Sequence, residues 1–394
     1  MSVSYTYSVF KDETKLDISY VPARLIHRER ELRLLEEFFN FIFKTPGKMT
    51  QRVIIAGAVG TGKTALAQRF GIDIMKKAEE HNLRFRYIHV NCREYRGSLF
   101  LILHHVVSAF HPNFPRRGFS SEEMLRILMQ ILDEQDVHVI LTLDEFESLV
   151  ERDGSEAVYK LTRLQETRLG MPQRISMIFI VRSLKPLESL DPSSRSTLQS
   201  NIICLDAYTQ EQLVDILNDR VKLAFKPFTV MEETVNLIAE LASSEGGNAR
   251  LAIELLWRAG KYADAEGFNI VTPECARKAA SSIYVLAKKS DLAYLGLHEK
   301  LFLLGVARLF KESDRAYATL SELERAYMIV CEEYGETPHS HTQLWKYLQN
   351  LAAQGILKAK VSSQGQRGRK TLISLLGIPA EELDKTITQL LGRK

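Results

Sequence analysis

The chain has 394 residues, 45% hydrophobic and 26% charged, which is the composition of an ordinary globular protein with about two or three domains. No apolar run approaches the roughly 18 residues that cross a bilayer. The N-terminus lacks a basic start followed by an apolar stretch, so we expect neither a membrane segment nor a secretory signal. Four separated cysteines without a CxxC pair predict reduced thiols in a cytoplasmic protein.

The net charge of +3 is unevenly distributed along the chain. Residues 339–394 contain nine Lys/Arg and three Asp/Glu, a net of +6, which leaves −3 for residues 1–338. No acidic residue stands between His339 and Ala380, so contact with a polyanion is expected to begin there. A basic face that is merely solvated is the alternative.

Strand-like apolar runs alternate with helical patterns from about residue 50 to residue 205. This alternation predicts a parallel sheet with helices on its faces. The predicted strands are 52–55, 85–91, 137–144, 176–181 and 202–205.

A phosphate-binding loop is predicted between the first strand and the helical run 65–74. Its sequence, Gly57-Ala58-Val59-Gly60-Thr61-Gly62-Lys63-Thr64, has the form G-x-x-x-x-G-K-T. The glycines let backbone N–H groups face phosphate oxygens, and the positive end of the helix adds to the attraction. We expect Lys63 to reach the β/γ-phosphates of ATP and Thr64 to ligate Mg²⁺. Ala65 completes the predicted nucleotide-binding loop.

Two acids, Asp144 and Glu145, end the apolar strand 137–144, about 80 residues after this loop. We expect Asp144 to hold Mg²⁺ through water and Glu145 to orient and polarise the attacking water. Two exposed acids at a strand end are the alternative.

Helix follows helix from about 209 to 290. Thr209 and Gln212 form a capping-box pattern, and Pro273 predicts a later helix start. The turn Gly246-Gly247 followed by Asn248 places Arg250 in the first turn of a helix, from which an arginine can reach a γ-phosphate. An exposed helical arginine without that role is the alternative.

The pattern of elements from about residue 297 predicts a winged helix. In this fold the third helix enters the major groove of DNA, and a hairpin wing reaches the backbone or minor groove. The predicted elements are helices 298–310, 321–334 and 341–353, and strands 356–361 and 371–376. Ser321 and Glu324 form a capping-box pattern for the second helix. Leucines 344, 348 and 351 fall at helical spacing and are predicted core.

Polar side chains on the third helix and on the wing are the candidate DNA contacts. Gln343 can read adenine, and Lys346 can bind guanine or phosphate. The third helix also offers His341, and the wing offers Arg367, Arg369 and Lys370. A winged helix that contacts protein instead of DNA is the alternative.

Five further segments carry a family resemblance. They are Tyr20–Glu31, Val90–Arg93, Leu190–Leu198, Gly247–Ile253 and Leu351–Arg369. In the same order they resemble the adenine-flanking box, a central segment, the stretch after sensor 1, sensor 2 and the winged helix of archaeal replication initiators of the origin-recognition type. These initiators are AAA+ ATPases.

This resemblance spans nearly the whole chain and implies three domains. They are a P-loop AAA+ domain with a parallel α/β sheet (1–206), an all-α lid (207–290) and a C-terminal winged helix (291–394). The resemblance implies that ATP or ADP also contacts Val21, Pro22, Tyr208, Arg220 and Arg250. The implied partners are double-stranded origin DNA, paralogous initiator subunits and the replicative helicase.

Two positions depart from the family's pattern. The family usually carries Asn at sensor 1, whereas Arg182 follows the strand 176–181 here, and arginine cannot accept a hydrogen bond. Asp191-Pro192-Ser193-Ser194-Arg195 stands where the family often has Asp-Pro-Arg, so the arginine that acts on a neighbouring subunit is either displaced to Arg195 or absent. Both departures predict ATP hydrolysis that is slow or dependent on a partner.

The family's helical insertion before the acidic strand implies a second DNA contact. The equivalent stretch here is short and carries Arg116 and Arg117 among aromatic residues. A plain surface loop is an equal alternative.

We therefore predict an ATP-binding replication initiator that binds origin DNA and helps to recruit the replicative helicase. An ATP-responsive DNA-binding regulator that loads no helicase is the second hypothesis, and Arg182 slightly favours it. A clamp-loader-like assembly ATPase is the third, but that family lacks a basic winged helix.

Overall fold

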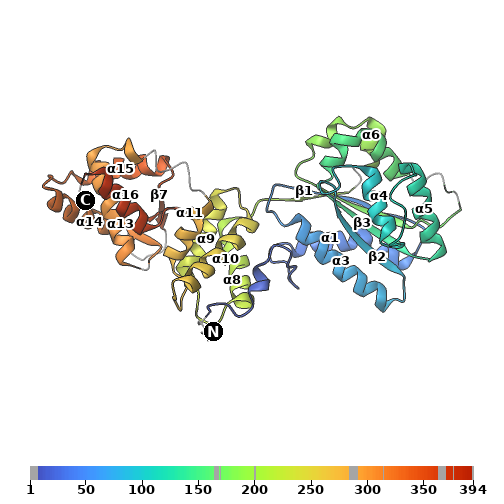
Figure 1. The fold of residues 1–394 in the computed structure, drawn as a ribbon, viewed down its shortest axis with the longest axis horizontal. Coiled ribbons are helices and arrows are strands. Elements are labelled where there is room, and N and C mark those ends of the chain that lie inside the picture. Colours follow the sequence, from blue (N-terminus) through green and yellow to red (C-terminus); the bar gives the residue numbers. More distant parts are fainter. Residues whose placement is uncertain are drawn as a thin grey trace. The chain divides into compact units, whose positions relative to one another are not determined.

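The structure is a computed structural model that describes residues 8–163, 168, 170–198, 201–283, 292–313, 315–362, 370–375 and 377–392. The chain divides into two units. One is Val21–Ala207, and the other joins Met1–Tyr20 to Tyr208–Lys394 (Figure 1).

A five-stranded parallel sheet with the order β2-β3-β4-β1-β5 lies at the centre of the unit 21–207. Its strands are β1 (Arg52–Gly57), β2 (Phe85–Asn91), β3 (His138–Asp144), β4 (Ile175–Val181) and β5 (Ile202–Leu205). All five predicted strands are confirmed to within two residues at each end. Every residue of β3 and β4 is buried, because helices cover both faces of such a sheet.

Helices pack on both faces of this sheet and form two separate hydrophobic clusters. Alternate residues of β1 point to opposite sides, so Ile55 belongs to the cluster with α3 and Ile54 to the cluster with α4 and α5. The helices of this unit are α1 (Glu29–Phe39), α2 (Phe41–Lys44), α3 (Lys63–Glu80), α4 (Leu99–Ser108), α5 (Ser121–Glu134), α6 (Glu147–Arg163) and α7 (Pro192–Leu198). Figure 1 shows α1 and α3 on one side of the strands and α4 to α6 on the other.

A helical lid opens the second unit. It consists of α8 (Gln210–Ala224), α9 (Glu232–Ser244), α10 (Ala249–Ala265) and α11 (Pro273–Ile283), with the short 3-10 helix η1 (Glu13–Leu16) beside them. The predicted capping box of Thr209 and Gln212 is confirmed. The N-terminal segment packs on this lid: the rings of Phe10 and Phe225 are 4.7 Å apart. A Cβ on Gly260 would lie 2.4 Å from the Phe10 ring, so this close approach requires glycine.

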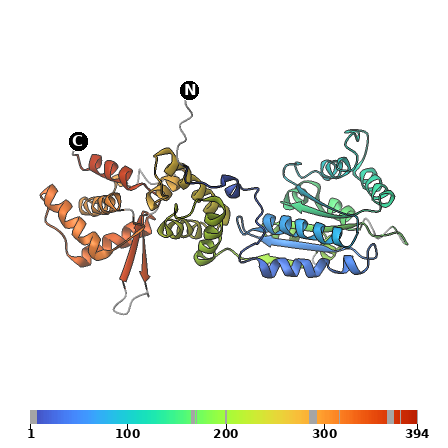
Figure 2. The same cartoon turned by 90° about the horizontal axis from the view of Figure 1, so that it is seen from below.

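A winged helix follows the lid and confirms the predicted class of fold. It consists of α13 (Leu297–Glu312), β6 (Tyr317–Thr319), α14 (Leu320–Tyr334), α15 (His341–Ala353), β7 (Leu357–Ser362), β8 (Lys370–Leu375) and α16 (Ala380–Leu390). The strands form an antiparallel sheet in the order β6-β8-β7, and β7 and β8 are the orange-red pair of arrows in Figure 2. The three leucines predicted as core on α15 are buried.

One predicted detail of this region is wrong. The capping box of α14 is formed by Thr319 and Glu322, not by Ser321 and Glu324. Thr319 still pairs with Leu372 as the last residue of β6, so it is extended and caps the helix that starts at the next residue. The sequence pattern missed β6, and the start of α14 was therefore misplaced.

None of the helices in the described residues is long and apolar enough to span a bilayer. All four cysteines are free thiols.

Candidate functional site

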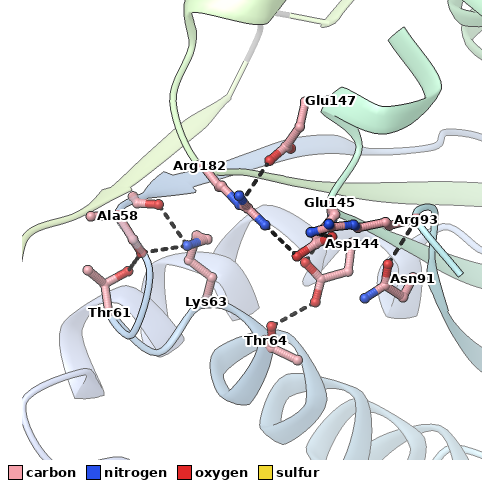
Figure 3. Close-up of polar contacts among 11 residues, drawn as sticks. Ala58, Thr61, Lys63, Thr64, Asn91, Arg93, Asp144, Glu145, Glu147 and Arg182 are labelled. Atoms are coloured by element: carbon pink, nitrogen blue, oxygen red, sulfur yellow. Dashed lines mark hydrogen bonds and ion pairs between the residues drawn. The ribbon is translucent and has the colours of Figure 1, made fainter. Parts of the chain in front are cut away.

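The loop after β1 curls around the ammonium group of Lys63. Gly60 and Gly62 have φ angles of 79° and 90°, a left-handed conformation that glycine adopts without strain. Lys63 Nζ donates to the carbonyl oxygens of Gly57 and Ala58 at 2.7 Å each, and the Thr61 hydroxyl donates to Ala58 O at 2.9 Å (Figure 3). The lysine therefore lies inside the loop, at the N-terminus of α3.

Asp144 ends β3 directly opposite this loop and is 6% exposed. Its Oδ2 accepts hydrogen bonds from Thr64 Oγ1 at 2.7 Å and from His89 Nε2 at 3.3 Å, and its Oδ1 accepts from the N–H of Glu145 at 2.8 Å. Burial alone would raise the pKa of Asp144, but the hydrogen bonds from His89 and Thr64 outweigh it and lower the pKa below its ordinary value. The carboxylate is therefore held ionised beside the Thr64 hydroxyl.

Arg182, the residue after β4, holds the carboxylate of Glu145. Its Nη2 donates to Glu145 Oε1 at 2.9 Å, and its Nε lies 3.5 Å from Glu147 Oε1 (Figure 3). Arg93 Nη1 lies 3.9 Å from the other oxygen of Glu145. Glu145 has a φ of 50°, a strained value for a residue other than glycine. The predicted base is thus paired with cations.

Glu147 is a site residue that the sequence interpretation missed. Both carboxylate oxygens are buried, and Oε1 faces Arg182 Nε at 3.5 Å. Burial raises the pKa of Glu147 above its ordinary value of 4.5, against the attraction of Arg182. In the sequence it is the first residue of an amphipathic helix, where an exposed acid is normal, so no local pattern marks it.

His89, Arg28 and Arg93 were also not predicted as site residues. Arg28 is 5% exposed, and its Nε donates to the carbonyl oxygen of Thr61 at 3.1 Å, so it supports the phosphate-binding loop from the N-terminal segment. His89 is marked only by its place on β2, two residues before Asn91, which pairs with Asp144 in the sheet. His89 could have been identified by pairing β2 with β3 in the sequence, because this pairing places it close to Asp144.

Three predicted nucleotide contacts lie in the other unit, on the lid. Tyr208 is 6% exposed in the lid core, and Arg220 is 7% exposed, with its guanidinium 4.9 Å from the Tyr20 ring. Asn248 caps α10 as expected, and Arg250 is exposed in its first turn. Their contact with nucleotide stays a prediction.

Three further predicted residues lie in the unit 21–207. Val21 and Pro22 precede α1, and Pro22 is buried. Arg195 is half-buried on α7, where Asp191 accepts from the N–H of Ser194 at 3.0 Å and caps the helix. Their roles also stay predictions.

The candidate DNA contacts on α15 form an exposed polar face. His341, Gln343 and Lys346 are exposed. His341 Nδ1 lies 3.1 Å from Glu324 Oε2 on α14, so part of its hydrogen-bonding capacity is used within the domain. Arg367 and Arg369 lie outside the described residues, and Lys370 begins β8.

Arg116 and Arg117 are exposed in an irregular loop between α4 and α5. The rings of Phe114 and Phe119 lie 5.1 Å apart and close the base of this loop. This stretch is thus a short loop, as its length in the sequence indicated, and its contact with DNA stays a prediction.

These two units define a class of protein: an AAA+ nucleotide-binding domain with a helical lid and a winged helix. Family models match in the same order. They are an AAA domain over residues 49–183, a Cdc6 AAA+ ATPase-type lid domain over 214–281 and a CDC6 C-terminal winged helix domain over 291–385.

Whole-chain relatives agree with these matches. The ORC1-type DNA replication protein 2 of Sulfurisphaera tokodaii is 37% identical over 390 residues, which is 96% of this chain and 92% of that protein. The crystal structure of Cdc6p from Pyrobaculum aerophilum is 33% identical with a TM-score of 0.84, covering 98% of this chain and 99% of that one. The structure of the Aeropyrum pernix ORC1 protein in complex with DNA is 28% identical with a TM-score of 0.64, covering 96% and 97%.

The chain belongs to the family of archaeal ORC1-type DNA replication proteins. This confirms the family resemblance and a role in the initiation of DNA replication. The AAA domain also identifies it as a nucleotide-binding protein of the ATPase type.

The buried carboxyl of Glu147 predicts a pH-dependent effect on stability. A carboxyl whose pKa is higher in the folded than in the unfolded chain favours folding at low pH, and this contribution is lost as pH rises through the folded pKa. Glu147→Gln lacks this pH-dependent contribution. As pH rises from 4 to 7, the unfolding free energy of the variant should therefore increase relative to that of the wild type. Urea unfolding at several pH values measures this, with Glu151→Gln on the exposed face of α6 as control. A pH-independent difference would contradict the prediction.

Proposed function

We propose that this chain binds ATP with Mg²⁺, hydrolyses it slowly, and binds origin duplex DNA to help recruit the replicative helicase. The observation that carries the proposal is the meeting of Lys63, Thr64, Asp144 and Glu145 at one edge of the sheet. These four residues lie in two separate segments of the chain, 63–64 and 144–145, and each has the chemistry its predicted role needs.

The nucleotide roles follow from this geometry. Lys63 supplies a positive charge to the β/γ-phosphates at the N-terminus of α3. The Thr64 hydroxyl and the Asp144 carboxylate, 2.7 Å apart, are hard oxygen ligands of the kind that Mg²⁺ prefers. Mg²⁺ bound there would neutralise phosphate charge. His89 and Thr64 hold the Asp144 carboxylate in place.

Slow hydrolysis is supported by the pairing of Glu145 with Arg182 and Arg93. A general base must accept a hydrogen bond from the attacking water. An arginine at 2.9 Å occupies one oxygen of Glu145, so that oxygen is not available to the attacking water while the pair is intact. Arg182 is half exposed, so this pair can separate at moderate cost. Turnover therefore requires Arg182 to leave Glu145 or to be drawn away by a partner.

DNA binding is supported by the exposed polar face of α15 and by the basic segment after it. The third helix of a winged helix enters the major groove, and Gln343 and Lys346 lie three residues apart on its outer face. The similarity to a relative whose structure was solved in complex with DNA points the same way.

A regulator that binds DNA in response to ATP and loads no helicase is the second candidate. The Arg182–Glu145 pair favours it, because a poor ATPase can still report nucleotide state. Recruitment of purified replicative helicase to origin DNA by the wild-type chain separates the two functions, and its absence would favour the regulator.

The nucleotide assignment predicts two distinct losses. Lys63→Ala removes the charge that holds the phosphates and should abolish ATP binding. Glu145→Gln keeps the site and should preserve binding while abolishing turnover. Equilibrium binding of a fluorescent ATP analogue and phosphate release measure the two quantities. Wild-type affinity in the Lys63→Ala chain would show that the loop is misassigned.

The Arg182 pair predicts a gain of activity. Arg182→Asn frees Glu145 and restores a side chain that can accept a hydrogen bond, so ATP turnover should rise, by about tenfold if the freed carboxylate recovers roughly 1.4 kcal/mol in the barrier. Single-turnover phosphate release measures this. Arg93→Asn is the control for the more distant cation, and its effect should be smaller. An unchanged rate for Arg182→Asn would place the limiting step elsewhere.

The DNA assignment predicts that substitutions on α15 and substitutions on the wing have different effects. Those on α15 should affect recognition of bases, and those on the wing should affect contact with phosphates. Gln343→Ala or Lys346→Ala should cost ~1–3 kcal/mol on a preferred site and little on random duplex. Replacing both Arg367 and Arg369 by Ala should weaken binding to every sequence and reduce the slope of log affinity against log salt by up to ~2. Titrations of the full chain at several salt concentrations measure both. An unchanged salt slope would move the phosphate contact off the wing and support a protein-binding winged helix.

A further inference from the structure

Three carboxylates of the lid are bonded to the winged helix within the second unit. Glu233 Oε2 accepts from the backbone N–H of Ala316 at 2.6 Å, and Glu274 Oε1 accepts from the N–H of Ala380 at 2.8 Å. Ala316 precedes β6 and Ala380 begins α16. The third carboxylate, Glu240 on α9, contacts the sheet of the winged helix directly.

Glu240 bonds to one complete row of residues across the three-stranded sheet. Ser374 on β8 is paired with Tyr317 on one side and with Lys358 on the other. The Tyr317 hydroxyl and the Ser374 hydroxyl donate to Glu240 Oε2 at 3.2 and 3.4 Å, and Lys358 Nζ lies 3.2 Å from Oε1. Glu240 is 1% exposed, so each strand of the wing's sheet is anchored to one buried lid charge.

A buried cation strengthens the same interface beside this row. Arg277 on α11 is fully buried, and its Nη2 donates to the carbonyl oxygen of Arg315 at 2.9 Å. Its Nη1 donates to Glu274 Oε2 at 3.1 Å, and its guanidinium lies 4.6 Å from the Phe310 ring. Ala316 is itself part of the lid's hydrophobic cluster. Separating lid and winged helix would therefore leave buried charges without partners, which is costly.

The contact gives Lys358 a role different from that of its neighbour on β7. Lys358 belongs to the basic segment expected to meet DNA, yet its ammonium is paired with a lid acid. Lys360 points to the same face two residues further along the strand. It is exposed and forms no ion pair in the part of the chain that the structure describes. The two lysines therefore form a matched pair, one tied to the lid and one directed to solvent.

We propose that Glu240 is a positioning residue that fixes the winged helix to the lid through Lys358, Ser374 and Tyr317. The lid and the winged helix then move as one body. A displacement of the lid that follows the nucleotide is transmitted to the DNA-binding helix. This rests on the proposed function, because it assumes that the chain binds both nucleotide and DNA.

The test compares DNA affinity in two nucleotide states of the full-length chain. The probe is a fluorescein-labelled duplex of mixed sequence, titrated with ADP or with a non-hydrolysable ATP analogue and Mg²⁺. The variants are Glu240→Gln, Lys358→Met, their combination, and Lys360→Met. Glu240→Gln keeps the side-chain volume and removes the charge, and Lys358→Met changes a half-exposed residue, so at least one of the two retains the fold.

The expected readout is the ratio of the two dissociation constants. In the wild type this ratio differs from 1, within the roughly 5–150-fold range of allosteric coupling. Glu240→Gln and Lys358→Met each bring it toward 1, and the combination goes no further than the larger single effect, because the two residues act as a unit. Lys360→Met keeps the wild-type ratio and weakens binding equally in both states.

The proposal would be overturned if Glu240→Gln gave the same ratio of dissociation constants as the wild-type chain. It would also be overturned if Lys358→Met weakened binding equally in both nucleotide states, as Lys360→Met is expected to do. A wild-type ratio of 1 with tight DNA binding would also overturn it, while leaving the proposed function intact. A wild-type chain that binds no DNA would instead refute the proposed function.

A distance measurement tests the anchoring without DNA. Nitroxide labels at Asn218 on α8 and Glu332 on α14 use exposed positions, in a Cys204→Ser background because the other three cysteines are buried. One narrow distance distribution is expected in both nucleotide states, with broadening in Glu240→Gln. A broad distribution in the wild type, or an unchanged narrow one in Glu240→Gln, would overturn the anchoring role of Glu240.

Discussion

The parallel register of β1, β4 and β3 is the constraint on which the nucleotide site depends. Their carboxyl ends meet at one edge of the sheet, so the phosphate loop after β1 and the acids after β3 face each other across β4. Any side chain that follows β4 must then lie between them. That position belongs to Arg182, and its contact with Glu145 is a consequence of strand order as much as of the residue's charge. A parallel sheet with another order would separate the same motifs.

The elements that the sequence predicted are those whose signals are local. Apolar runs bounded by turns revealed all five strands of the large sheet, and the G-x-x-x-x-G-K-T pattern together with Asp144 and Glu145 identified residues that the fold brings together. The errors arose where the structure of a residue or segment depends on a partner that is distant in the sequence. The strand β6 is three residues long and exists because it pairs with β8. Glu147 and Arg28 carry no pattern of their own, since only burial against other segments distinguishes them from surface charges.

In the winged helix, the charges that lie close together in space differ from those that lie close together in the sequence. The interval from His339 to Ala380 contains no acid, yet acids from other elements reach it. Glu324 of α14 lies beside His341, and Glu240 of the lid lies beside Lys358. The basic surface available for the proposed DNA contact is therefore smaller than the sequence implies. It is concentrated on residues such as Lys346 and Lys360, which are exposed.

The lid connects the two predicted activities through a short stretch of chain. Glu240 lies near the end of α9 and Arg250 in the first turn of α10, with the turn at Gly246 and Gly247 between them. A force on Arg250 from a phosphate would act at the start of one helix, and Glu240 would carry it from the end of the preceding helix to the wing's sheet. Both helices pack in the same lid core, which is too dense to absorb a displacement locally. A displacement at one end of this pair therefore has to appear at the other.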